Sequence, residues 1–152
     1  MTAPDGFWLA VDPGKTTGLA TAHPGSDEPS AWEMPLEGAL DWAWDWMSAY
    51  CGRGDVTVVC ESYVIGPATL RKGGAGGTWS LRGLGALEWM ARRNGHRFVE
   101  QRPAEAKAFG TDAKLRALGW WSPSDHARDA LRHLLLARVA GGEEGLAAAV
   151  LG

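Results

Sequence analysis

A nearly continuous apolar run at residues 56–65, interrupted by one carboxylate, constrains this fold more than any other feature. Valines and Cys60 fill the start of the run, and Glu61 follows them directly. Such a run is typical of a central strand that is buried on both faces. A carboxylate in so apolar a strand is costly unless something pairs with it. The sequence therefore predicts a sheet flanked by helices, with a partner for Glu61.

A second carboxylate ends the first predicted strand. Residues 7–12 form an apolar strand that runs into Asp12, and Pro13-Gly14 follows at once. Residues 17–23 form the next strand, and the short turn between the two predicts an antiparallel hairpin. Asp-Pro-Gly is good type I turn chemistry, so Asp12 either begins a turn or is a metal ligand. This segment alone leaves both alternatives open.

Hydrophobic spacing predicts the other elements. Leu36, Leu40, Trp44 and Met47 share one face of a buried amphipathic helix. The remaining predicted elements are a strand at 30–34, the helix at 36–50, a Gly-rich basic loop at 66–78, a helix at 79–94, a strand at 96–101, a helix at 112–118 and a helix from Ser122 or Ser124 to about 140. Three antiparallel strands followed by alternating helix and strand resemble the ribonuclease H-like fold. The expected fold is α/β, with a mixed five-stranded sheet flanked by helices.

Length and composition indicate one globular domain. The chain has 152 residues, of which 45% are apolar, enough for a single sizeable core. We expect one domain over 1–152, with its core at 7–140 and a flexible C-terminal tail at 141–152. No apolar run approaches the length needed to cross a bilayer, and no signal peptide is visible, so we expect a cytoplasmic protein without a membrane partner.

Charge is distributed unevenly along the chain. Residues 1–66 carry two basic and ten acidic groups, whereas residues 67–138 carry thirteen basic and six acidic groups. A basic half beside an acidic half indicates a polyanion-binding face, although solvated helix faces would give the same count. The candidate contacts for a polyanion are Lys15, Arg71, Lys72 and Arg82. Two of them lie in the loop at 66–78, and the alternative interpretation of that loop is a mobile surface segment without a binding role.

A group of acids and a histidine carries the chemistry. Asp12 and Glu61 lie on strands that we expect to be neighbours, and His126 and Asp129 are three residues apart on one helix face. Carboxylates on three elements would suit two divalent cations, which stabilise the attacking and leaving oxygens of a phosphodiester. Asp125, four residues before Asp129, is a rival third ligand. Taken singly, His126 could be a surface histidine and Asp125 a first-turn acid favoured by the helix dipole.

These motifs together resemble the RuvC family of Holliday-junction resolvases. Asp12-Pro13-Gly14 with Thr17-Gly18 is similar to the opening motif of that family, and Glu61 in Val-Val-Cys-Glu-Ser-Tyr is similar to its second acid. His126-Ala-Arg-Asp129-Ala-Leu resembles its closing helix. The resemblance runs from about residue 7 to 140. The intervening side chains match poorly, which indicates a divergent member, and the Arg, Gly and Ala bias suits a bacteriophage with a GC-rich genome.

The resemblance implies a metal-dependent endonuclease that resolves Holliday junctions or other branched DNA in recombination and repair. Asp12, Glu61, His126 and Asp129 would hold two Mg²⁺ or Mn²⁺ ions, and cleavage would leave 5′-phosphate and 3′-hydroxyl ends. The family works as a homodimer, with the helix at 79–94 at or near the dimer surface. A phage-encoded member would act in the host-cell cytoplasm.

Other functions stay open at this point. A nuclease of the same fold that acts on flap or replication-fork DNA or on RNA, and a non-catalytic DNA-binding domain, would both fit the sequence. A P-loop does not fit, because Leu9 stands where that motif needs its first glycine.

Overall fold

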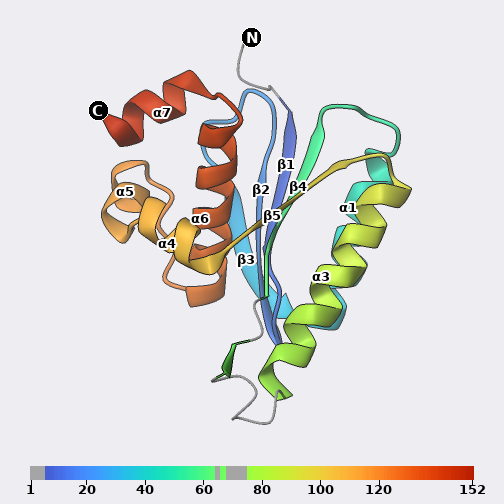
Figure 1. Ribbon diagram of the computed structural model, residues 1–152. Coiled ribbons are helices and arrows are strands. Elements are labelled where there is room, and N and C mark those ends of the chain that lie inside the picture. Colours follow the sequence, from blue (N-terminus) through green and yellow to red (C-terminus); the bar gives the residue numbers. More distant parts are fainter. Residues whose placement is uncertain (1–5, 64–65, 68–74) are drawn as a thin grey trace.

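A mixed five-stranded sheet forms the centre of the protein (Figure 1). The computed structural model describes residues 6–63, 66–67 and 75–152, and the side chains of 75–77 are not included. The strands are β1 (Phe7–Asp12), β2 (Thr16–Ala22), β3 (Ser30–Pro35), β4 (Val56–Glu61) and β5 (Arg97–Gln101). Their order is β3-β2-β1-β4-β5, with β2 antiparallel to β1 and β3, and β4 parallel to β1 and β5. The predicted hairpin, sheet and fold class are confirmed.

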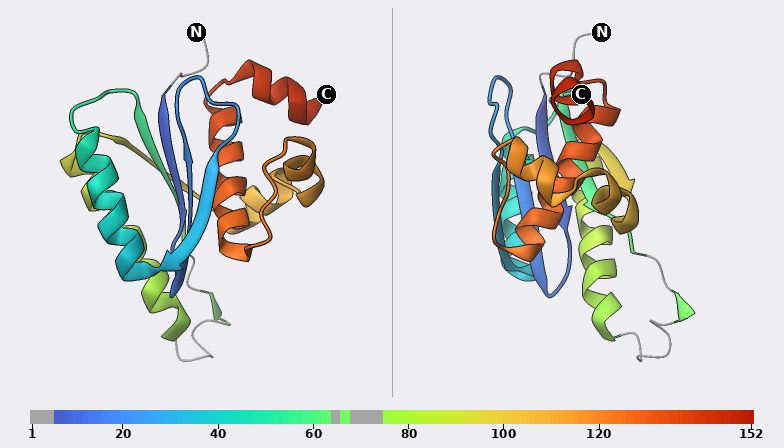
Figure 2. Two further views of the ribbon diagram at one scale, coloured as in Figure 1. Left: turned by 180° about the vertical axis from the view of Figure 1, so that it is seen from behind. Right: turned by 90° about the vertical axis from the view of Figure 1, so that its left-hand side faces the viewer.

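Helices cover both faces of this sheet (Figures 1 and 2). They are α1 (Leu36–Ala49), α3 (Ala75–Arg93), α4 (Pro103–Phe109), α5 (Asp112–Ala117), α6 (Asp125–Ala140) and α7 (Glu144–Leu151). Helices α1 and α3 pack on one face, and α6 packs on the other with α4, α5 and α7 around it. No described helix is both long and apolar enough to cross a membrane.

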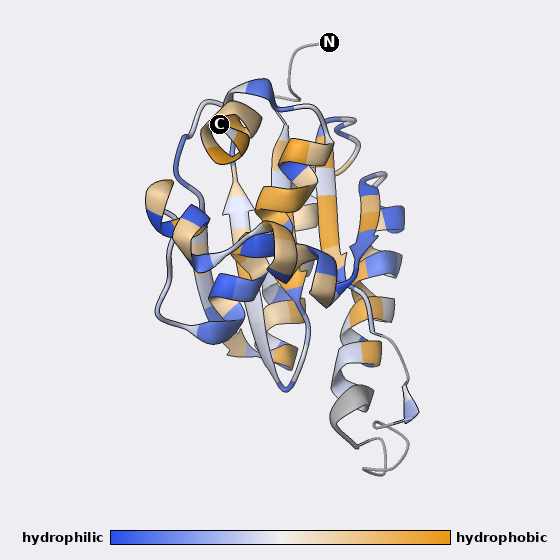
Figure 3. Ribbon diagram, turned by 60° about the vertical axis from the view of Figure 1, so that its left-hand side comes forward, coloured by the Kyte–Doolittle hydropathy of each residue, from blue (hydrophilic) through white to orange (hydrophobic). Residues whose placement is uncertain are grey.

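Alternation along the strands divides the core between the two faces. Leu9 and Val11 of β1 pack with α1 and α3, whereas Trp8 and Ala10 pack with α6. Successive strand residues point to opposite faces, so Asp12 belongs to the α6 face. In Figure 3 the central strands are largely hydrophobic, whereas the helices carry both hydrophobic and hydrophilic turns.

Two glycines allow the helices to approach the sheet closely. A Cβ on Gly18 in β2 would lie 1.9 Å from the backbone oxygen of His126, so only glycine allows α6 to rest here. A Cβ on Gly83 in α3 would lie 2.6 Å from Cβ of Pro13, in the turn after β1. The Ser80 hydroxyl also donates to the Pro13 carbonyl at 2.8 Å. A helix on each face of the sheet, α6 on one and α3 on the other, therefore packs closely against the region of the β1–β2 turn.

The tryptophan-rich helix faces the sheet differently from the prediction. Its buried residues are Leu36, Ala39, Ala43 and Met47. Trp44, predicted to be buried, is 38% exposed and stacks on Trp89 of α3 at a centroid distance of 5.8 Å. Alanines at 39 and 43 allow the helix to lie close to the strands, which turns the bulky Trp44 outward. The prediction for Trp44 is wrong.

Three further predictions need correction. Helix α3 begins at Ala75, so the predicted loop at 66–78 ends earlier than its glycines indicated. Helix α4 was not predicted, although Pro103 at its first position is favourable for a helix start. The expected flexible tail at 141–152 contains α7, whose Leu146 and Val150 pack against the core on the α6 face.

Candidate active site

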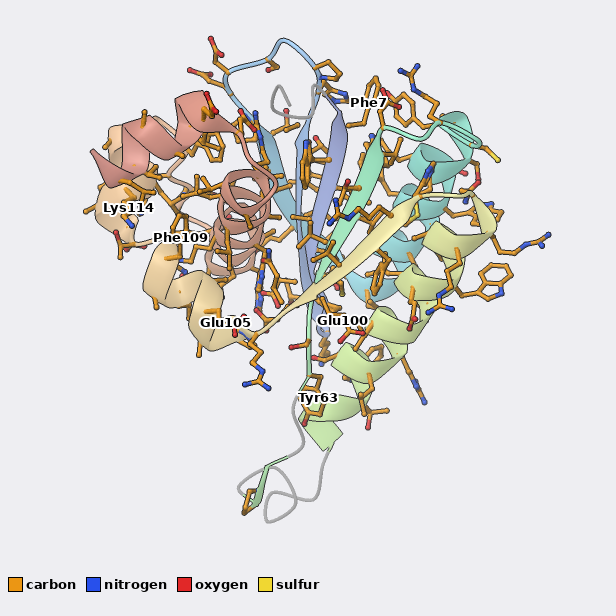
Figure 4. All side chains as sticks on the ribbon, turned by 45° about the horizontal axis from the view of Figure 1, so that its top comes forward. Phe7, Tyr63, Glu100, Glu105, Phe109 and Lys114 are labelled. Carbon is orange, nitrogen blue, oxygen red and sulfur yellow. The ribbon has the colours of Figure 1, made fainter. Side chains whose placement is uncertain are left out.

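Three polar side chains occupy the carboxyl ends of the three parallel strands. Asp12, Glu61 and Gln101 are the last residues of β1, β4 and β5. Val11 pairs with Cys60, and Glu61 pairs with Gln101, so the three residues lie in a row across the sheet. Figure 4 shows Tyr63 just beyond the end of β4 near this edge. Open α/β sheets commonly bind ligands at this edge.

Helix α6 lies across this row and adds polar side chains of its own. His126, Asp129 and His133 are spaced by three and four residues, so they share the helix face turned to the strands. Behind them, Ala130 and Leu134 continue the same face into the apolar core. The close approach at Gly18 fixes the height of this helix over β2. One helix therefore supplies the partners of both strand-end acids.

Asp12 is the most perturbed acid of the site. It is only 7% exposed, and its Oδ2 lies 3.0 Å from Nδ1 of His126. Burial raises the pKa of Asp12 from 3.8 to about 6, and the charges of Glu61 and Asp129 add to the rise, although the His126 hydrogen bond lowers it. A carboxylate in this position carries a negative charge that its surroundings do not fully compensate.

His126 has a raised pKa and an accessible ring. Burial alone would lower the pKa, but the hydrogen bond to Asp12 and the charge of Asp12 more than offset that effect. Its side chain is 44% exposed. The ring therefore stands between the buried acid and solvent, where it can meet a ligand.

Glu61 is held by a second histidine of α6. Nε2 of His133 lies 2.8 Å from Oε2 of Glu61, and the His133 side chain is 1% exposed. The same imidazole meets Gln101 through Nδ1 at 3.0 Å. The partner that Glu61 needs in its apolar strand is thus a buried histidine that joins the ends of β4 and β5.

Asp129 is held by cations on its outer side. Arg132 makes an ion pair with it, and Nζ of Lys107 lies 3.6 Å from its Oδ2. Arg132 also donates to the Gly110 carbonyl at 2.9 Å and pairs with Asp112. Asp129 remains within electrostatic reach of Asp12, whose pKa it raises.

The structure separates Asp125 from this group. Its side chain is 82% exposed and pairs with Arg128 at 2.6 Å. Asp12, Glu61, His126 and Asp129 instead lie together at the strand ends, linked by the His126 hydrogen bond and by their mutual charge effects on Asp12.

Two of the four predicted basic contacts, Lys15 and Arg82, belong to the part of the chain that the structure describes. Lys15 is exposed in the turn after Asp12. Arg82 is exposed on α3, with its guanidinium 6.0 Å from the ring centroid of Trp79. Arg71 and Lys72 lie outside the described residues.

Sequence reasoning did not identify His133, Gln101 or Arg132 as site residues. His133 follows His126 by seven residues and Asp129 by four, a helical spacing that places it on the same face. Gln101 ends a predicted strand, as the two acids do. Both patterns were present in the sequence, whereas the pairing of Arg132 with Asp129 depends on side-chain orientation.

The donor set suits a hard divalent cation. The carboxylates of Asp12, Glu61 and Asp129 are oxygen donors of the kind that Mg²⁺ and Mn²⁺ prefer, and His126 adds one imidazole nitrogen. Among the described residues, no three histidine, cysteine or acidic side chains are arranged so that they could hold a metal ion. The three acids of the site instead pair with protein side chains: Asp12 with His126, Glu61 with His133 and Asp129 with Arg132. The raised pKa of Asp12 shows a surplus of negative charge that a cation would relieve.

The fold is similar to that of two solved RuvC structures. A solved structure described as T. thermophilus RuvC in complex with Holliday junction substrate matches with a TM-score of 0.65 and 14% sequence identity, over 89% of this chain and 94% of that chain. A second Thermus thermophilus RuvC structure matches with a TM-score of 0.51 and 18% identity, over 88% and 95% of the two chains. No protein-family model and no curated protein matches the sequence. The likeness establishes a RuvC-like, ribonuclease H-like fold, as predicted.

Proposed function

We propose that this protein is a metal-dependent endonuclease that resolves four-way DNA junctions or other branched DNA. One observation carries the proposal: two acids at adjacent strand ends meet an acid and a histidine of α6 at the edge where this fold class binds ligands. The similar fold of a RuvC that was solved with a Holliday junction supports a junction as the substrate.

In this proposal, Asp12, Glu61, Asp129 and His126 hold two Mg²⁺ or Mn²⁺ ions. The ions would supply charge stabilisation for the attacking and leaving oxygens and a more acidic water, giving 5′-phosphate and 3′-hydroxyl ends. Asp12 and Glu61 must be ionised to serve as ligands. The His126 side chain is 44% exposed, so its ring would be able to turn from Asp12 toward a cation.

The DNA would lie across this edge, with basic groups on both sides. Lys15 beside Asp12 and Arg82 on α3 are exposed, and we include Arg71 and Lys72 from the segment after β4. Contacts of this kind position the phosphate backbone and make binding depend on salt.

A cleavage assay on four-way, forked and linear DNA with Mg²⁺ or Mn²⁺ tests the function. The four-way junction should be cut fastest, and Asp12→Asn and Glu61→Gln should each reduce cutting by about 1,000-fold or more while junction binding persists. Undiminished cutting by both variants would refute the active-site assignment. Faster cutting of forked DNA would move the substrate class to flaps and forks.

The proposed enzyme is a homodimer, because symmetric cleavage of a junction needs two sites. Helix α3 and α1 expose apolar side chains on one surface: Leu81 is 43%, Trp89 57% and Trp44 38% exposed. Gly85 lies between Leu81 and Trp89, and a Cβ there would meet nothing within 4 Å. This surface offers a notch into which a second α3 could pack.

Trp89→Glu tests that interface. The charge should shift the molecular mass in solution from dimer to monomer, as measured by sedimentation or light scattering. Arg97→Glu, an exposed change at the start of β5, is the matched control and should leave the mass unchanged. A monomeric wild-type protein that cuts both junction strands would contradict the dimer.

A further inference from the structure

His133 makes a buried polar connection that the proposed chemistry does not use. The imidazole comes from the middle of α6, its side chain is 1% exposed, and leucines occupy the next two positions of the helix. A buried polar ring is costly unless both nitrogens have partners. Its partners are the carboxylate of Glu61 and the amide of Gln101.

The Gln101 amide determines which nitrogen of His133 carries the proton. Beside that amide lie the His133 carbonyl, which only accepts, and the Ala137 N–H, which only donates. The amide nitrogen therefore donates to the carbonyl at 3.1 Å and to Nδ1 at 3.0 Å, and the amide oxygen accepts from Ala137 N at 3.2 Å. Nδ1 is then an acceptor, which leaves the proton on Nε2. Nε2–H donates to Oε2 of Glu61 across 2.8 Å.

We propose that His133 is a positioning residue for Glu61. Its N–H holds Oε2 and so directs Oε1 toward the cation that the site would bind, while Gln101 fixes the tautomer that allows this. The inference rests on the proposed function, because it assigns Glu61 as a metal ligand. Donors behind a ligand orient it, and their loss commonly weakens metal affinity by 10–100-fold.

Packing alone would not require this arrangement. A leucine fills a similar volume, and α6 already places leucines at 131, 134 and 135 in the core. A ring whose only role was to fill space would need no partners at the ends of two neighbouring strands. Glu61 and Gln101 are paired in register, so both strands present their last side chain to one imidazole.

Mn²⁺ titration of the full chain by calorimetry, without DNA, tests the inference. His133→Leu removes the donor and should weaken Mn²⁺ binding by about tenfold or more. His133→Gln can keep an N–H near the Nε2 position and should stay within about threefold of the wild type. Leu135→Ala, which disturbs the same helix without touching Glu61, is the packing control and should bind Mn²⁺ like the wild type. Thermal melts establish that each variant is folded.

A double-mutant cycle separates positioning from general stability. If His133 acts through Glu61, adding His133→Leu to Glu61→Gln should weaken Mn²⁺ binding no further. Equal Mn²⁺ affinity of wild type and His133→Leu, or full additivity of the two changes, would overturn the positioning role. A wild type whose Mn²⁺ affinity does not depend on Glu61 would instead overturn the proposed metal site, and this inference with it.

A proton-detected ¹⁵N spectrum of the histidines provides a readout that needs no metal. The wild type should show His133 as the Nε2–H tautomer, and Gln101→Leu should reduce that preference. An Nδ1–H tautomer in the wild type would overturn the inference.

Discussion

The two faces of the sheet are built from the same strands but end differently. Toward α1 and α3, the strands present apolar side chains up to Val11 and Cys60. Toward α6, they present Ala10 and Val59 and then end in Asp12 and Glu61. Because side chains alternate along a strand, Asp12 and Glu61 point to the face opposite that of Val11 and Cys60, which precede them.

The helices differ in the same way. Helix α6 places His126 and Asp129 opposite the strand ends. Helix α3 instead contacts Pro13, in the turn after β1, through Gly83 and Ser80. One face therefore becomes a site with unbalanced charge, and the other face supports it from behind.

Removing the proposed third metal ligand, which α6 supplies, should strongly reduce cleavage, although less than the loss of Asp12 or Glu61. His126→Ala takes away the proposed donor beside Asp12 and should reduce Mn²⁺-dependent junction cleavage by about 100-fold or more. Asp125→Asn, on the neighbouring exposed residue paired with Arg128, is the control and should stay within about threefold. A large loss for Asp125→Asn alone would assign the third ligand to Asp125.

Adding a side chain at the close contact between β2 and α6 should disturb the fold and the site together. Gly18→Ala places a Cβ 1.9 Å from a backbone oxygen that cannot move aside alone. We expect a loss of about 3 kcal/mol or more in the free energy of unfolding, measured with denaturant. Gly38→Ala, in an exposed turn of α1 with 3.9 Å of clearance to Met34, should instead be neutral or stabilise by about 1 kcal/mol. Equal effects would contradict the close packing of α6 on β2.

The charge surplus of the α6 face predicts a specific pH dependence in EDTA. The pKa of Asp12 is raised to about 6, so the folded protein binds this proton more tightly than the unfolded chain does. The free energy of unfolding should therefore fall as the pH rises from about 4 to about 6. His126 has a raised pKa as well, so its contribution is present below pH 6.5 and is lost as the pH rises through its folded-state value.

Asp12→Asn tests this dependence directly. A rise of the pKa from 3.8 to about 6 corresponds to about 3 kcal/mol, and the loss of the charged partner of His126 offsets part of it. Without metal, the variant should be more stable than the wild type by about 1–2 kcal/mol at pH 7.5 and show little difference at pH 4. Lower stability of Asp12→Asn at pH 7.5 would mean that His126 compensates the buried charge fully.

The smallest expected effect concerns the basic side chains that are proposed to contact DNA. Arg82→Ala should weaken junction binding and lower the slope of log affinity against log salt by about 1, and Arg71→Ala with Lys72→Ala by about 2. Arg53→Ala is the control, because Arg53 pairs with Asp55 at the opposite end of the strands. An unchanged slope in both test variants would remove Arg71, Lys72 and Arg82 from the DNA path.

Much of the fold could be predicted because local signals agreed with the tertiary arrangement. The apolar run before Glu61 is the central strand, and the short turn after Asp12 joins an antiparallel pair. Gly119 closes α5 with a φ of 74°, as a glycine after a helix commonly does. Trp44 was mispredicted because an apolar side chain can face either the sheet or a neighbouring helix, and spacing alone does not distinguish them.

The sequence alone determined which residues could share the site. Alternation assigns Asp12 and Glu61 to the same face of the sheet. Helical spacing assigns His126 and Asp129 to the same face of their helix. Only the tertiary structure decided which pairs form: His126 with Asp12, His133 with Glu61 and Arg132 with Asp129. The reason is that those pairs depend on the height of α6 over the strands, which is set where Gly18 meets the backbone of His126. No local pattern in the chain encodes that contact, because 108 residues separate its two sides.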